Sequence, residues 1–241
     1  MPVSSIELAV AIVVTAVGAL VQGTIGIGFG IVSVPILSLV NPTLAPVPQL
    51  LLAVPLAMSM AWRERSHIER GGVTWLLAGR LPGAVLGLGL LAVATERTLD
   101  LGIAVSVLIG VAILGAGLTV PRSRVTEFGT GIIAGVMGMI ASIGGPPAAL
   151  LFKDEKGPTV RSTLAMFFSF GLLVTVVARI AGGRITADDV TLALLLSPGL
   201  VAGYMASTRL RSRADGSTIR PAILGISSLA AIGLLIRAVT S

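Results

Sequence analysis

Glycines and short polar side chains gather in one part of the first long apolar run of the sequence. Residues 23–30 read GTIGIGFG, and four glycines in eight residues are typical of a broken helix. The first N–H groups of a helix that restarts after a break have no partner within that helix. They also carry about half a positive charge from the helix dipole, so such a start binds anions. The candidate anion-binding residues of this segment are Gln22, Gly23, Thr24, Gly26, Gly28, Gly30 and Ser33.

A second segment of the same kind lies in the fifth apolar run, where residues 142–147 read SIGGPP. Proline and glycine at this density also break a helix. Its candidate residues are Ser142, Gly144, Gly145, Pro146 and Pro147. The alternative is that these glycines only allow helices to pack closely. Packing is favoured for any single glycine, whereas a binding site is favoured for the two segments as a pair.

Two arginines are further candidates for anion binding. Arg80 lies well inside an apolar run, just before Pro82, and an ionisable group at such depth is costly and usually functional. The alternative is that this run is offset and the Arg80 side chain reaches an interface. Arg161 follows the second glycine segment at the start of the sixth run. It is either an anion gate or an ordinary positive anchor, and the anchor is favoured.

Residue types argue against an enzyme. The chain has no cysteine and one histidine, His67, which lies between charged residues in a predicted loop. All the acidic residues fall in or beside loops, so no paired carboxylates or metal-ligand cluster are expected in the core. There is no nucleotide-binding motif either. We therefore expect no catalytic residue, no metal site and no cofactor.

The elements that carry these residues are predicted to be membrane helices. Apolar residues make up 54% of the chain and charged residues 12%, against about 25% charged in a soluble domain. The charges are bunched between apolar runs of about 20 residues, the length that crosses a bilayer as a helix. The net charge of +6 comes mainly from arginines near the ends of these runs, so we expect a lipid bilayer and no nucleic acid as partner. The runs are 6–40, 43–62, 72–94, 98–119, 127–152, 159–180, 188–209 and 218–238.

An internal repeat divides the chain into residues 1–120 and 121–241. A shift of 112 places Gly23 on Gly135, and a shift of 116 places Pro82 on Pro198. The runs 6–40 and 127–152 are each predicted to be a broken helical hairpin that opens one half. Each half then has about five segments, and an odd number inverts the second copy relative to the first. The predicted fold is an all-α polytopic membrane protein built from two inverted repeats.

Loop charges predict the orientation of the chain. With hairpins, twelve Lys and Arg residues fall on one side of the membrane and four on the other, whereas eight simple crossings divide them evenly. Cytoplasmic loops carry the excess of Lys and Arg. We therefore expect a protein of the inner membrane with both termini in the periplasm.

Three stretches of the chain resemble the sulfite exporter TauE/SafE family, also called the toluene sulfonate uptake permease family. They are GTIGIGFG at 23–30 followed by Pro35, GGPP at 144–147, and RSTLAMFF at 161–168. The similarity covers essentially the whole chain. It implies a transporter whose partner is a small sulfur-containing anion such as sulfite, a sulfonate or thiosulfate. The resemblance leaves the substrate and the direction of transport open.

We expect a secondary transporter that exports such an anion by alternating access. One alternative is an anion channel with the same site, and another is a non-transporting subunit of a membrane complex. The sequence also leaves a homodimer open. Export is favoured because a negative-inside membrane drives each negative charge outward by about 2.3 kcal/mol per 100 mV.

Overall fold

The chain folds into α-helices joined by short connections. The computed structural model describes residues 3–116, 120–152, 155, 157–210 and 216–240. Within these ranges there are ten α-helices and two short 3-10 helices, and no strand. The α-helices are α1 Ser5–Ile25, α2 Phe29–Val40, α3 Val47–Arg63, α4 Arg70–Ala92, α5 Glu96–Gly115, α6 Arg124–Ala141, α7 Gly145–Leu151, α8 Gly157–Ala181, α9 Ala187–Leu210 and α10 Gly216–Thr240. The 3-10 helices are Pro42–Leu44 and Arg65–His67.

Several helices begin directly after a residue with a hydroxyl side chain. Ser4, Thr95 and Ser123 each accept a hydrogen bond from a backbone N–H of the first turn, and each forms a reciprocal capping box. Such a cap satisfies donors that a helix start otherwise leaves without partners. The capped helices are α1, α5 and α6, which are otherwise apolar over most of their length.

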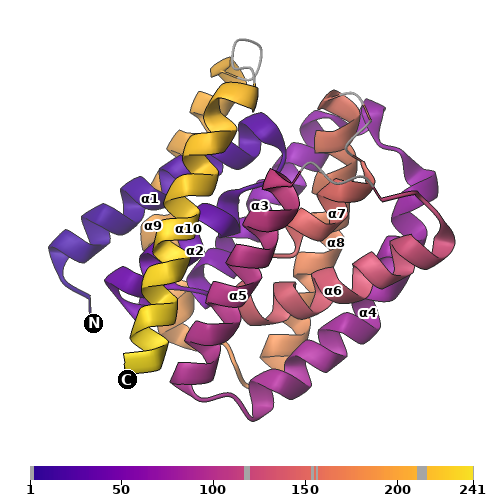
Figure 1. Ribbon diagram of the computed structural model, residues 1–241. Helices are drawn as coiled ribbons and strands as arrows, with labels where there is room; N and C mark the ends of the chain where they lie inside the picture. The colour runs from indigo at the N-terminus through magenta and orange to yellow at the C-terminus, as the bar shows by residue number, and fades with distance from the viewer. Residues whose placement is uncertain (1–2, 117–119, 153–154, 156, 211–215, 241) are drawn as a thin grey trace.

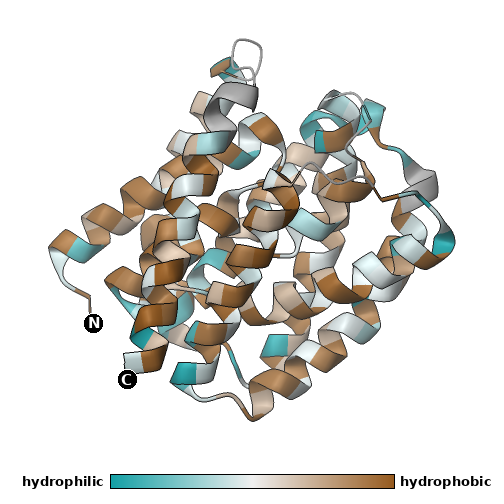
Figure 2. Cartoon of the chain, in the orientation of Figure 1, coloured by the Kyte–Doolittle hydropathy of each residue, from teal (hydrophilic) through white to brown (hydrophobic). Residues whose placement is uncertain are grey.

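Seven helical segments are long and apolar enough to cross a membrane, and hydrophobic residues predominate along the helices (Figure 2). The chain is therefore a multi-pass membrane protein. α2 is a shorter apolar helix. The seven segments are Ser5–Ile25, Pro42–Arg63, Val73–Ala92, Glu96–Gly115, Gly157–Ala181, Ala187–Leu210 and Pro221–Thr240.

Both predicted helix breaks are confirmed. α1 ends at Ile25, Gly26 turns left-handed with a φ of 100°, and α2 begins at Phe29 after Gly28 with a φ of 129°. α6 ends at Ala141, Ser142 is left-handed with a φ of 57°, and α7 begins at Gly145. The two left-handed caps lie 116 residues apart.

Glycines bring two pairs of helices into close contact. Gly79 and Gly83 of α4 face backbone carbonyls of α6, and a Cβ at either position would lie within 2.3 Å of a carbonyl oxygen. Gly199 and Gly203 of α9 face carbonyls of α1, and a Cβ at either position would also lie within 2.3 Å of a carbonyl oxygen. α5 packs on α10 and α3 packs on α8. These four glycines therefore allow the two helix pairs to pack closely.

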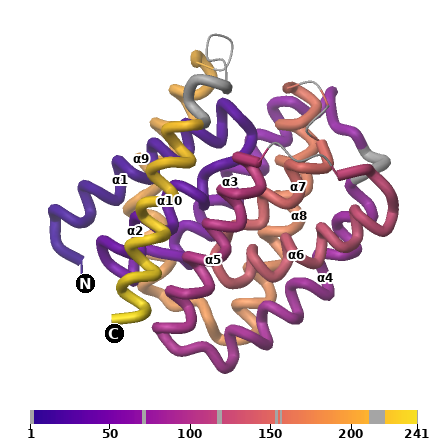
Figure 3. The backbone as a smooth tube through the Cα atoms, viewed as in Figure 1, coloured from indigo at the N-terminus to yellow at the C-terminus, as the bar shows by residue number. Residues whose placement is uncertain are grey.

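The two ends of the chain lie on the same side of the molecule. In Figures 1 and 3 the N and C labels are at the lower left, and the connections from α4 to α5 and from α8 to α9 are also low. The end of α3, the start of α8 and the end of α9 lie at the opposite, upper side. We call these the terminal side and the basic side, because the upper ends carry most of the arginines.

Candidate functional site

A cavity lies between the two helix breaks. Its volume is about 30 Å³. α1, α2, α3, α4, α7 and α8 contribute to its wall, together with the connections that follow α1 and α6. The lining residues are Gln22, Ile27, Gly28, Phe29, Gly30, Ile31, Ala53, Arg80, Ser142, Ile143, Gly144, Gly145, Pro146, Phe168 and Leu172.

The structure brings eight of the candidate residues together in this cavity and leaves six outside its lining. Those that line it are Gln22, Gly28, Gly30, Arg80, Ser142, Gly144, Gly145 and Pro146. Those that do not are Gly23, Thr24, Gly26, Ser33, Pro147 and Arg161. The two glycine segments, which are more than 110 residues apart in sequence, thus form one site in space.

The hydroxyls predicted as anion donors already have other partners. Thr24 Oγ1 donates to the Leu20 carbonyl at 2.8 Å, and Ser33 Oγ donates to the Phe29 carbonyl at 2.6 Å. Ser142 lines the cavity, but its Oγ donates to the Pro46 carbonyl at 3.2 Å. A Ser or Thr in a helix commonly bonds to a carbonyl of the preceding turn. In this structure each of the three hydroxyls therefore donates to a backbone carbonyl and not into the cavity.

Arg80 is the central cation of the cavity. Its residue is 2% exposed, inside the membrane-spanning part of α4, so the alternative that it reaches an interface is wrong. Its Nη1 lies 3.4 Å from the Ala134 carbonyl, and its Cζ is 5.0 Å from the centroid of the Phe167 ring. Within the described residues Arg80 forms no ion pair, and its buried Nε has no hydrogen-bond partner. A buried charge without a counter-charge is energetically costly, which points to a functional role.

Three glycines from separate segments make room for the Arg80 side chain. A Cβ on Gly171 of α8 would lie 1.8 Å from Arg80 Nε, and one on Gly144 would lie 2.6 Å from Nη1. A Cβ on Gly138 of α6 would lie 2.8 Å from Nη2. Gly138 and Gly171 were not among the site residues predicted from the sequence. No signal in the sequence connects them to Arg80, because their relation depends on how α4, α6 and α8 pack.

The start of α2 presents backbone donors to the same cavity. Gln22 Oε1 accepts the Phe29 N–H at 3.0 Å, and the Gly28 carbonyl accepts the Val32 N–H at 3.0 Å. The N–H groups of Gly30 and Ile31 lie in the first turn, where a helix provides no acceptor of its own. Both residues line the cavity. The positive end of the α2 dipole and the Arg80 guanidinium therefore contribute to the same space.

The second break supplies fewer donors than expected. Pro146 and Pro147 occupy the start of α7, and proline has no N–H. α7 is also only seven residues long, from Gly145 to Leu151, so its dipole is small. The second break therefore shapes the cavity rather than providing a second set of backbone donors.

Arg161 lies near the first break but is engaged in an ion pair. Its Nε is 3.1 Å from both carboxylate oxygens of Glu64, and a Cβ on Gly26 would lie 2.9 Å from its Cγ. Glu64 also pairs with Arg63, whose Nη2 donates to the Gly23 carbonyl at 2.9 Å. Glu64 is 6% exposed, although the sequence places it beside a loop. Arg161 therefore neither lines the cavity nor serves as a simple exposed anchor.

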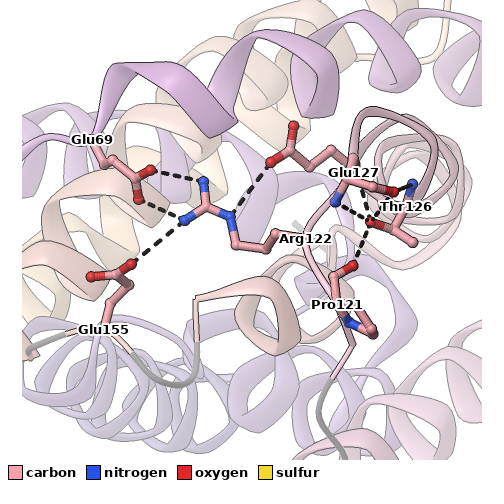
Figure 4. Close-up of polar contacts among 7 residues, drawn as sticks. Glu69, Pro121, Arg122, Thr126, Glu127 and Glu155 are labelled. Atoms are coloured by element: carbon pink, nitrogen blue, oxygen red, sulfur yellow. Dashed lines mark hydrogen bonds and ion pairs between the residues drawn. The ribbon is translucent and has the colours of Figure 1, made fainter.

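A second ionic cluster lies further toward the basic side. Figure 4 shows Arg122 among three glutamates, with its guanidinium 2.8 Å from both carboxylate oxygens of Glu69. Glu127 lies 3.5 Å from its Nε and Glu155 lies 3.6 Å from its Nη1. The hydrogen bonds to Glu69 are the main cause that raises the pKa of Arg122 above its usual value. This cluster ties the segments before α4, α6 and α8 to one another.

The described residues contain no group of three or more His, Cys, Asp or Glu side chains that could hold a metal ion. His67 lies in an exposed connection beside Ser66, as predicted. The features that remain are a bundle of membrane helices, a cavity inside it, and one buried cation beside a helix start. They define the class of helical membrane proteins with a cavity and a buried arginine inside the helix bundle.

Comparison with known families agrees with that class. Residues 10–234 match the family model described as Sulfite exporter TauE/SafE, and the chain belongs to this family. It is therefore a membrane transporter and not an enzyme. No curated protein and no solved structure matches the chain.

Proposed function

We propose that the protein exports sulfite, or a related sulfur oxyanion or organosulfonate, across the inner membrane. The anion binds between the Arg80 guanidinium and the N–H groups of Gly30 and Ile31. The observation that carries this proposal is the buried Arg80, whose Nε has no partner among the described residues, in the wall of a cavity at a helix start. Oxyanions accept several charge-assisted hydrogen bonds at once, and such bonds are the strongest that a protein offers.

The inverted-repeat plan belongs to the same proposal. The pairing of helices supports it: α4 packs on α6 as α9 packs on α1, and α2 packs on α10 as α7 packs on α5. If each helix of α1–α5 takes the place of the corresponding helix of α6–α10, and the reverse, the pair α4 and α6 becomes the pair α9 and α1. In the same way the pair α2 and α10 becomes the pair α7 and α5. α3 and α8 contact each other, as do α5 and α10, which the same exchange leaves unchanged. In such transporters the substrate lies where the two repeats meet, at broken helices.

Alternating access is favoured over a channel by the contacts on the basic side. The pair of Arg161 and Glu64 lies against the first break, and the Arg122 cluster lies beyond it. A carrier needs contacts of this kind that close one side and separate when that side opens. The proposed orientation, with the basic side in the cytoplasm, makes them the inner closure.

A panel of anions on the purified protein tests this proposal. Sulfite, thiosulfate, taurine, sulfoacetate and sulfate are compared by thermal shift, since a ligand at 100 times its dissociation constant stabilises a protein by about 2.7 kcal/mol. The anion with the largest shift is then followed in proteoliposomes by exchange of labelled for unlabelled anion. Saturable exchange is expected of a carrier, and single-channel currents would indicate a channel. If no anion binds or moves, the chain acts as a subunit of a larger complex and the proposal is wrong.

A further inference from the structure

A second arginine is buried inside the bundle, near the end of α8. Arg179 is 3% exposed, and its Nη2 donates to the Met139 carbonyl of α6. Its buried Nε has no hydrogen-bond partner among the described residues, where Arg179 also forms no ion pair. The sequence analysis counted this residue among the loop charges.

A purely structural role explains only part of this arrangement. The Met139 carbonyl is in the last turn of α6, where carbonyl groups have no partner within the helix, and a cation at such an end is favourable. A neutral donor such as glutamine would also satisfy that carbonyl. It would avoid the cost of burying a charge, which is larger than the gain from one hydrogen bond. The charge and the unpartnered Nε of Arg179 therefore require another explanation.

Arg179 and Arg80 contact neighbouring residues of α6. The Arg80 side chain lies against Gly138, and Arg179 bonds to the carbonyl of Met139. Along α8, Gly171 contacts Arg80, and Arg179 follows two turns later, about 12 Å along the axis. Thr175 lies between them on the same buried face. α8 runs from the basic side toward the terminal side, so Arg179 lies on the terminal side of Arg80 (Figure 1).

We propose that Arg179 forms a second binding station for the transported oxyanion, between the Arg80 cavity and the terminal side of the membrane. This inference rests on the proposed function and adds the route by which the anion enters or leaves. An anion that leaves Arg80 passes along α6 and α8 to the unpartnered donor of Arg179. With a positive charge at both Arg80 and Arg179, the anion has a counter-charge at two points along its route through the apolar interior.

The test compares transport from the two faces of the membrane. Arg179→Gln keeps a donor for the Met139 carbonyl but loses the charge. Arg184→Gln is the matched control, because it removes an exposed positive charge at the same end of α8. Sulfite uptake is measured in right-side-out and inverted membrane vesicles, and sulfite binding is measured on purified protein.

For Arg179→Gln we expect sulfite binding within twofold of the unmodified protein. The KM for sulfite presented at the terminal side should rise about tenfold, the effect of losing one charge-assisted hydrogen bond, while the KM at the basic side stays unchanged. Arg184→Gln should leave both values unchanged. Equal KM values for Arg179→Gln and the unmodified protein at both faces would overturn the inference. So would a loss of binding together with an equal loss of transport from both faces.

A conservative variant keeps the test decisive if Arg179→Gln does not fold. Arg179→Lys retains the charge but loses the planar set of donors. It should show the same asymmetric rise in KM, and the absence of any asymmetry would overturn the inference. Failure of the proposed function looks different, because the unmodified protein itself would then neither bind nor transport sulfite.

Discussion

Arg80 is the residue on which the account of anion binding depends. Its side chain fills space that three glycines leave open, and its buried Nε has no hydrogen-bond partner among the described residues. The sequence indicated the depth of this arginine, since it lies inside an apolar run. It did not indicate Gly138 and Gly171, because the chain has 30 glycines and nothing in the sequence distinguishes these two from the others. Only the packing of three helices identifies which glycines matter.

A single methyl group at Gly171 should therefore disturb binding without removing any charge. Gly171→Ala places a Cβ against Arg80 Nε and forces the guanidinium to move. We expect sulfite to bind about 10–100-fold more weakly, the effect of one or two misplaced charge-assisted hydrogen bonds. Isothermal titration calorimetry of the purified variant provides the measurement.

Gly89→Ala is the control for that variant, since a Cβ at Gly89 would meet no atom within 4 Å. It should bind sulfite as the unmodified protein does. Normal sulfite affinity of Gly171→Ala would mean that the position of the Arg80 guanidinium is not important for binding.

At the scale of elements, the helix start of α2 is the feature that most distinguishes the first break from the second. Both breaks were predictable, because glycine and proline are poor helix formers and their clusters interrupt otherwise regular apolar runs. The difference between them was also present in the sequence. Pro146 and Pro147 cannot donate, so only the first break provides several backbone donors. The partners of Thr24, Ser33 and Ser142 were not predictable, since a hydroxyl can turn to a nearby carbonyl in any helix.

Two substitutions of Gln22 should separate the stability of α2 from its charge. Gln22→Glu keeps the acceptor for the Phe29 N–H but places a negative charge in the cavity beside Arg80. We expect this variant to fold normally and to lose sulfite binding, because the new carboxylate competes with the anion. Gln22→Leu removes the acceptor and should lower stability by about 1 kcal/mol, the usual cost of losing a helix cap.

Thermal unfolding and sulfite binding of both Gln22 variants provide the comparison. If Gln22→Glu binds sulfite normally, the anion does not approach the start of α2.

At the scale of the whole molecule, the separation of charges defines an orientation. Seven spans and the short helix α2 place both chain ends on the side opposite most arginines. The sequence predicted this from loop charges because the hairpin count alone divides the arginines unevenly. It could not predict the ionic clusters of Glu64 and Arg122, whose partners come from segments up to 97 residues apart.

Cysteine labelling in intact cells tests the orientation, and the absence of native cysteines makes it specific. Thr240→Cys should react with a membrane-impermeant maleimide, because we expect the exposed end of α10 to face the periplasm. Ser66→Cys lies in an exposed connection on the basic side and should react only after the membrane is permeabilised. The reverse pattern would place the basic side outside and would contradict export through the proposed inner closure.

The most direct test of the central claim is sulfite exchange by Arg80→Gln in proteoliposomes. Glutamine is smaller and uncharged, so it fits the space between the glycines while removing the cation that binds the anion. We expect the variant to fold, to insert into liposomes as the unmodified protein does, and to exchange sulfite at less than about a tenth of the unmodified rate. Exchange by folded Arg80→Gln at the unmodified rate would show that the anion does not pass through this cavity.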